Sequence, residues 1–361
     1  MNYMRFRKFL RYFKIYFFVI FFVVGLIVIV RNISDQDNPF NYPNFRLIQE
    51  FGLWKFFFIA NLCLTLWVAF LSSLIDLFIL PKLFYKRSLS TVLFIGFIVQ
   101  LILITLITMV IRDLIQILLS QISQSEIEAP PGAIQILPLI ITLIFSILIS
   151  RIFIEIDRKL GPGNLWKMLT GKFYRPREEE RIFMFIDLQD STPIADKLGH
   201  IEFSKLLKDC YHDFAIVDDY RAEIYQYVGD EVVISWPLIQ GFKNNNFLKA
   251  FFVFDGLLSK RAEYYEKQYG VKPFFKSGAN MGPVVVTEVG EIKREITYHG
   301  DTLNTAARIQ GMCNELKSQM LIPEGLYEMV KDTREFTFED VGSTKLKGKE
   351  KQVRLYKVTE A

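Results

Sequence analysis

The chain has 361 residues, of which 51% are hydrophobic and 15% aromatic, and its formal net charge is +4. Because its mean hydropathy is also positive, an entirely soluble two-domain protein is disfavoured, and part of the chain is expected to face lipid. Residues 1–160 carry 15 Lys and Arg against 9 Asp and Glu, a net +6, which leaves 28 against 30, a net −2, for residues 161–361. A nucleic-acid-binding face on the polar half is therefore disfavoured.

The three cysteines, Cys63, Cys210 and Cys313, are far apart, and the chain has only three histidines. A disulfide framework and a zinc site are both poorly supported by this pattern. The sequence also lacks Gly-x-x-x-x-Gly-Lys-Ser/Thr, which excludes a Walker-type nucleotide site.

Four apolar stretches, residues 15–30, 53–80, 89–111 and 134–154, are long enough to cross a bilayer. The first follows a basic and aromatic run, and no small-residue cleavage site follows it, so it is interpreted as an uncleaved signal anchor. Residues 1–157 are thus predicted to form an all-α domain of four transmembrane helices.

Basic residues gather before the first stretch, in the second loop and after the last stretch, whereas the first and third loops are poor in Lys and Arg. By the positive-inside rule, the chain is predicted to be a multi-pass protein of the cell membrane. Both termini and the polar half are expected in the cytoplasm.

Three polar residues interrupt the apolar stretches: Asn61, Asp76 and Gln100. Asp76 could be a ligand or signalling contact inside the bundle. The favoured interpretation is that it lies near the cytoplasmic end of its helix and reaches the membrane interface.

Residues 158–180 begin with a Gly-Pro-Gly turn and end in a charged run. They contain too few Ser and Gly residues for a flexible tether, so a short cytoplasmic coupling element is predicted.

Residues 181–361 alternate between β and helical patterns and are predicted to form one α+β domain. The expected strands are residues 182–188, 223–228, 232–236, 274–278 and 284–289, with helices at 192–217, 245–269 and 302–313 and a loop and last strand at 344–358.

Two carboxylates stand where strands end. Asp187 follows a buried run, and Asp230 occupies the turn of a hairpin. If those strands are neighbours, both carboxylates could hold two hard divalent cations, Mg²⁺ or Mn²⁺. The alternative for Asp230 is an ordinary Gly-Asp hairpin turn.

The segment Gln189, Asp190, Ser191, Thr192 joins the first strand to its helix, where backbone N–H groups could hold phosphate oxygens. Plain capping by Ser191 or Thr192 is the alternative. Further on, Asn304 and Arg308 are four residues apart and share a helix face.

Three motifs together resemble the class III adenylate/guanylate cyclase catalytic domain. They are Phe-Ile-Asp-Leu-Gln-Asp-Ser-Thr at residues 185–192, Tyr-Val-Gly-Asp-Glu at 227–231 and His-Gly-Asp-Thr-Leu-Asn-Thr-Ala-Ala-Arg at 299–308. The resemblance covers about residues 181–358. It implies a ferredoxin-like α+β domain that acts as a head-to-tail homodimer with sites at the interface.

Site roles also follow from this resemblance. It implies that Asp187 and Asp230 bind two Mg²⁺ or Mn²⁺ ions, with help from the Leu188 carbonyl. Asn304 from the partner subunit would orient the ribose, and Arg308 would stabilise charge on the α-phosphate. The stretch with Lys347 and Lys349 corresponds to a phosphate-contacting region.

The implied reaction converts ATP to 3′,5′-cyclic AMP and pyrophosphate. At the base-reading positions of the family this chain has Gln226, where adenylate cyclases have lysine, and Thr297, which fits. Guanylate cyclases typically place a Glu at the first position, so the sequence favours ATP, with cyclic GMP synthesis or a catalytically inactive membrane receptor as alternatives. Besides ATP, the expected partners are a second copy of the chain, the lipid bilayer and an unknown membrane ligand.

Overall fold

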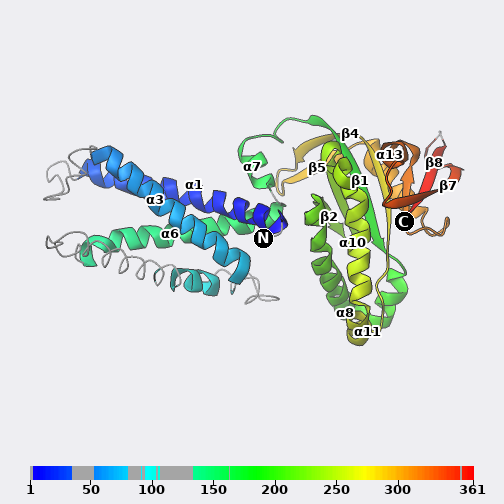
Figure 1. The fold of residues 1–361 in the computed structure, drawn as a ribbon, viewed down its shortest axis with the longest axis horizontal. Coiled ribbons are helices and arrows are strands. Elements are labelled where there is room, and N and C mark those ends of the chain that lie inside the picture. Colours follow the sequence, from blue (N-terminus) through cyan, green and yellow to red (C-terminus); the bar gives the residue numbers. More distant parts are fainter. Residues whose placement is uncertain are drawn as a thin grey trace. The chain divides into compact units, whose positions relative to one another are not determined.

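A computed structural model describes residues 3–34, 53–79, 91, 94–102, 105, 133–161, 163–349 and 352–361. The chain divides into two compact units, Met1–Leu160 and Gly161–Ala361 (Figure 1). The first unit is helical and the second contains a mixed sheet with helices.

The N-terminal unit contains α1 (Tyr3–Ser34), α3 (Leu53–Leu74), the π-helical segment η1 (Ile75–Ile79) and α6 (Ala133–Leu160). Among the described residues, Arg5–Ile27 and Asn61–Ile79 are long and apolar enough to cross a membrane. The fourth expected stretch coincides with α6. Most of the third lies outside the described residues, although residues 94–102 are helical.

The interpretation of Asp76 as an interface residue was wrong. Its side chain is buried, and it accepts hydrogen bonds from Tyr16 at 2.7 Å and Arg151 at 2.8 Å. Gln100 joins this cluster, because its Oε1 accepts a bond from Arg151 Nε at 2.9 Å. The pairing could not be predicted from the sequence, because Asp76 and Arg151 are 75 residues apart and meet only in the tertiary structure. A buried charge needs such a partner.

The C-terminal unit is built on one eight-stranded sheet with the order β2-β3-β1-β4-β6-β8-β7, and β5 pairs with β4. The strands are β1 (Arg177–Leu188), β2 (Glu223–Val228), β3 (Glu231–Pro237), β4 (Phe275–Val289), β5 (Glu295–His299), β6 (Met320–Pro323), β7 (Phe336–Thr344) and β8 (Val353–Glu360).

The helices of this unit are α7 (Asn164–Leu169), α8 (Ser191–Phe214), α9 (Leu238–Phe242), α10 (Asn246–Lys260), α11 (Ala262–Tyr269), α12 (Asp301–Gly311) and α13 (Glu324–Val330). Two 3₁₀ segments, η2 (Ala215–Tyr220) and η3 (Lys243–Asn245), connect them. The first half of the unit runs β1-α8-β2-β3-α10-β4 with spatial order β2-β3-β1-β4, which is the ferredoxin-like arrangement.

Alternation along β1 gives the sheet two buried faces. Ile182, Met184 and Ile186 pack in the main core with α8 and α10. Phe183 points to the opposite face and packs with Ala306 of α12. Since side chains alternate with period two, Asp187 shares the α12 face.

The first three expected strands are confirmed, but residues 274–278 and 284–289 belong to one long strand, β4. Gly282 and Pro283 lie between the two expected strands. Both pair with β1, whereas on the other edge β6 and β5 pair with residues 277–278 and 285–289 only. Between these partners the Thr302 hydroxyl donates to the Pro283 carbonyl at 2.9 Å, so α12 supports the strand across the gap.

Candidate active site

Antiparallel pairing between β1 and β3 brings the two predicted metal-binding carboxylates together. Asp187 is opposite Glu231 in this ladder, and Asp230 lies in the preceding turn. Asp230 is close enough to Asp187 to raise the pKa of that carboxyl. The strands that were expected to be neighbours are therefore neighbours.

Burial and the nearby Asp230 raise the pKa of Asp187 to about 6. Burial, with Asp187 and Asp230 beside it, raises the pKa of Glu231 to about 7. We call these three side chains the carboxylate cluster. Like charges brought together on a half-buried surface favour protonation or a bound cation.

Glu231 was missed by the sequence analysis. Its position beside Asp230 was visible, but only the β1–β3 register shows that it faces Asp187. Within the described residues no group of three or more Asp, Glu, Cys or His side chains is placed to hold a metal ion. An arrangement of carboxylates that leaves coordination positions open suits Mg²⁺, which usually keeps waters and binds substrate phosphates.

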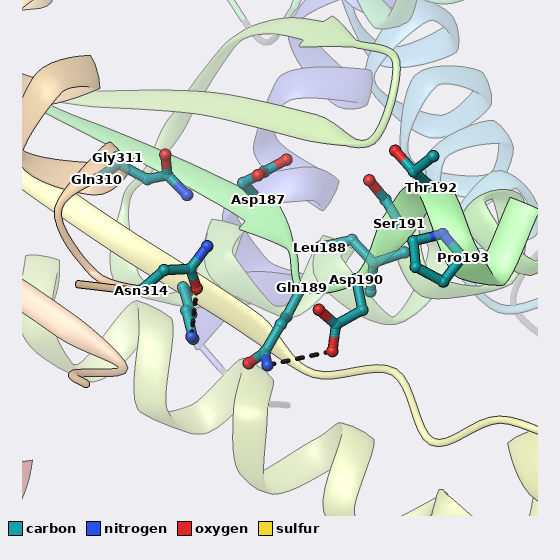
Figure 2. A pocket seen from close by; sticks show the side chains of 11 residues that line it. Asp187, Leu188, Gln189, Asp190, Ser191, Thr192, Pro193, Gln310, Gly311 and Asn314 are labelled. Carbon is teal, nitrogen blue, oxygen red and sulfur yellow. Dashed lines mark hydrogen bonds between the residues drawn. The ribbon is translucent and has the colours of Figure 1, made fainter. Parts of the chain in front are cut away.

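A pocket of about 290 Å³ opens beside Asp187 (Figure 2). We call residues 189–192 the phosphate loop, and all four of them line the pocket. The rest of the lining comes from the end of β1, the first turn of α8, β4, the end of α12 and the turn that follows it: Asp187, Leu188, Pro193, Lys276, Gln310, Gly311 and Asn314. The phosphate loop and the first carboxylate thus share one cavity.

The loop has a defined conformation. Asp190 adopts left-handed backbone angles (φ 56°) at the N-cap position of α8, one residue before the expected caps. The Gln189 N–H donates to the Phe274 carbonyl at 2.8 Å. The Asp190 side chain forms no cap bond to the backbone of α8, although Asp190 occupies the N-cap position.

Three polar residues of the pocket, Gln310, Lys276 and Asn314, were not anticipated from the sequence. The Gln310 amide lies beside the Asp187 carboxylate (Figure 2) and lowers the pKa of Asp187, against the larger effect of burial. Lys276 donates to Asn314 at 2.5 Å across the pocket wall. These residues carry no motif signal, because their proximity arises only from packing of α12 against β4.

Asn304 and Arg308 are on α12, outside the lining of this pocket. Thr302, Thr305, Ala306 and Ile309 form the buried stripe of the helix, whereas Asn304 is exposed. The shared face of Asn304 and Arg308 therefore differs from the face that packs on the sheet.

The C-terminal loop docks on the same helix. Leu346 is buried with Ile309, and Lys349 forms an ion pair with Asp301 in the first turn of α12. A Cβ added at Gly348 would lie 3.3 Å from an Arg308 guanidinium nitrogen. Lys347, which is exposed, is thus held on the segment that adjoins Arg308.

The two base-reading candidates lie on β2 and β5. Gln226 is exposed beside an irregularity in the β2–β3 ladder, and Thr297 pairs with Thr287 of β4. Their neighbours Tyr225 and Tyr298 have ring centroids 5.2 Å apart. The structure therefore brings together the segments that contain Gln226 and Thr297.

Comparison with known proteins identifies the family. Residues 173–360 match the family described as the adenylate and guanylate cyclase catalytic domain. Adenylate cyclase 2 of Rhizobium meliloti (strain 1021) is 31% identical over 227 residues, covering 62% of this chain and 62% of the relative. Adenylate cyclase 1 of the same organism is 26% identical, covering 50% of this chain and 27% of the relative.

The chain thus spans less than two thirds of the length of these curated relatives. A bacterial light-regulated adenylyl cyclase is similar in fold, with a TM-score of 0.52 and 18% identity, covering 62% of this chain and 65% of that one. Because the family match includes more than half of the residues, this chain belongs to the adenylate and guanylate cyclase family.

Proposed function

We propose that the chain is a class III adenylate cyclase that converts ATP to cyclic AMP and pyrophosphate. The observation that supports this most strongly is the carboxylate cluster beside the phosphate-loop pocket, because both lie within the segment that matches the family. The adenylate cyclases among its relatives favour ATP as the substrate.

Asp187 and Asp230, with the Leu188 carbonyl, would hold two Mg²⁺ or Mn²⁺ ions. Such ions, when bound, would acidify the ribose 3′-hydroxyl and neutralise charge on the phosphates. Gln189, Asp190, Ser191 and Thr192 would offer their loop to the phosphate oxygens. The cluster fits this role because it supplies oxygen ligands and leaves room for substrate oxygens.

Asn304 would orient the ribose, and Arg308 would stabilise the charge that develops on the α-phosphate. Both would come from the second subunit of a homodimer. Their separation from the pocket of their own chain supports this assignment.

Gln226 and Thr297 would read the base. An amide donates to adenine N1 and accepts from N6, but the flipped amide accepts from guanine N1–H and donates to O6. Cyclic GMP synthesis is therefore the second candidate.

The N-terminal unit would anchor the enzyme as a four-span domain of the cell membrane, with both termini in the cytoplasm, and would regulate it in response to an unidentified membrane ligand. Two candidate spans and the coincidence of α6 with the fourth apolar stretch support this. Residues 158–180 would couple the two domains, 1–157 and 181–361. Within the second unit, Phe173 of this segment is buried, and its carbonyl accepts a bond from Glu288 of β4.

The decisive experiment incubates purified full-length protein with equal concentrations of ATP and GTP, in the presence of Mn²⁺ or Mg²⁺, and measures both cyclic nucleotides. We expect cyclic AMP as the main product and no product from Asp187→Ala. More cyclic GMP than cyclic AMP would reverse the substrate assignment. Nucleotide binding without pyrophosphate release would favour the inactive receptor.

A further inference from the structure

The turn that contains Asp230 joins the edge strand β2 to β3. Val228 pairs with Glu231 across the turn, but the second half of β2, Gln226 to Val228, is exposed and the ladder is irregular between Ile224 and Gln226. Gly229 adopts a positive φ of 63°, which gives the turn its sharp reversal. A contact from outside the sheet would restrict the position of this turn further.

Tyr211 of α8 supplies that contact. Its hydroxyl donates a hydrogen bond to the Gly229 carbonyl at 2.8 Å. Its ring lies against the Tyr227 ring, with centroids 4.7 Å apart. The other side of Tyr211 packs against the main hydrophobic core. Tyr211 therefore connects the core to Tyr227 and to Gly229, the residue that precedes Asp230.

The environment keeps this hydroxyl a donor. Burial and the charge of Asp230 raise the pKa of Tyr211 above its ordinary value. A phenol is protonated near neutral pH even at its ordinary pKa, and this shift favours the protonated form further, so the hydroxyl can donate to the turn while nearby carboxylates ionise.

We propose that Tyr211 is a positioning residue that holds the Gly229–Asp230 turn and so places Asp230 for cation binding. This inference rests on the proposed function, because it assumes that Asp230 is a metal ligand. Tyr211 does not touch substrate; it acts through the hydrogen bond to the turn and the contact with Tyr227.

The test is Tyr211→Phe in the full-length protein, which keeps the ring contact and removes only the hydrogen bond. We expect the Mn²⁺ concentration for half-maximal activity to rise about fivefold, which corresponds to the loss of one hydrogen bond. The rate at saturating Mn²⁺ should stay within about twofold of wild type, because the chemistry at the site is unchanged. Tyr211→Leu removes both contacts and should shift the Mn²⁺ requirement further.

A second measurement does not use activity. Electron paramagnetic resonance of free Mn²⁺, titrated with protein and a non-hydrolysable ATP analogue, should show the same order of affinities: wild type, then Tyr211→Phe, then Tyr211→Leu. This measurement also applies to a variant whose activity is too low to analyse.

The matched control is Tyr269→Phe. The Tyr269 hydroxyl of α11 donates a hydrogen bond at 2.7 Å to Asp209, which is on α8 like Tyr211. This variant should lose thermal stability without any change in Mn²⁺ affinity. Equal Mn²⁺ affinity in wild type and Tyr211→Phe, or an equal shift in Tyr269→Phe, would overturn the inference. Wild-type protein without metal-dependent cyclase activity would instead contradict the proposed function.

Discussion

Arg151 Nη2 lies 2.8 Å from Asp76 Oδ1, and each side chain is only 5% exposed in a helical unit composed mainly of apolar residues. Tyr16 and Gln100 add hydrogen bonds from two further segments. Because a buried charge without a partner is costly, this pair requires its four segments to keep their present arrangement.

Removal of one charge should therefore destabilise the unit. We expect Asp76→Asn to cost about 3–5 kcal/mol, since it removes the carboxylate charge that faces the buried Arg151 guanidinium. The double variant Asp76→Leu, Arg151→Met should recover most of that loss. Thermal loss of helical circular dichroism in detergent measures both, and a double variant less stable than Asp76→Asn would contradict this account.

Gly96 offers an independent test of the same pair. A Cβ at this position would lie 2.3 Å from an Arg151 guanidinium nitrogen, so Gly96→Ala should displace the guanidinium and lower the same thermal midpoint. Gly25→Ala, whose Cβ would lie 3.2 Å from Asn61, is the milder control. A Gly96→Ala protein as stable as wild type would show that Arg151 has room to move.

The carboxylate cluster predicts a dependence of stability on pH. The pKa values of Asp187 and Glu231, about 6 and about 7, exceed the ordinary values of about 4, so the folded state binds protons more tightly than the unfolded state. Their contribution is therefore largest below pH 4 and is lost as the pH rises through 6 and 7. In EDTA, Asp187→Asn should be inactive yet more thermally stable than wild type at pH 8.

The measurement is the thermal midpoint of the C-terminal unit at pH 6 and pH 8, with and without Mn²⁺. Mn²⁺ should stabilise wild type more at pH 8, when the carboxylates are ionised, and should have little effect on Asp187→Asn. If Asp187→Asn melted below wild type at pH 8 in EDTA, repulsion within the cluster would not be the dominant effect.

Arg181 is a buried connection between β1 and its neighbours. It donates to Glu179 at 3.0 Å, Glu223 at 2.6 Å and Ser235 at 2.9 Å. Arg181→Met should lower the thermal midpoint of the C-terminal unit and reduce cyclase activity, because β1 also contains Asp187. Lys167→Ala, which removes the pair with Glu223 at 3.6 Å together with weak contacts to Asn164 and Phe173, should cost less than Arg181→Met. Equal effects of the two variants would contradict the central role of Arg181.

The two lysines of the C-terminal loop have different surroundings. Lys349 forms an ion pair with Asp301, whereas Lys347 is exposed next to Gly348, which lies close to the Arg308 guanidinium. Lys347→Ala should therefore raise the KM for ATP about tenfold, the size expected for one charge-assisted contact. Lys349→Ala should change it less. The opposite order in steady-state kinetics would assign the phosphate contact to Lys349.

Much of the catalytic half could be predicted because its motifs are local. The strand that ends at Asp187, the Gly229–Asp230 turn and the helix with Asn304 and Arg308 each have a signal within a few residues. The proximity of Gln310 and Glu231 to Asp187 depends on strand register and helix packing, which no short pattern encodes. For the same reason, the partner of Asp76 could not be read from the sequence.

Short elements were also missed. β5, β6, α13 and β7 are each nine residues or fewer. β6 has only four residues and is stabilised by β4 and β8, which are far from it in the sequence. Its assignment as a strand therefore depends on tertiary pairing more than on local propensity.

The central claim is a two-metal cyclase site shared between two chains, and complementation tests it most directly. Asp187→Ala and Arg308→Ala should each be inactive alone, since every homodimer would lack one half of both sites. Co-expressed, they should form heterodimers with one intact site and return about a quarter of wild-type cyclic AMP synthesis, because half of the dimers are mixed and each mixed dimer has one site of two. No recovery from dimers shown to be mixed would contradict a site built from both subunits.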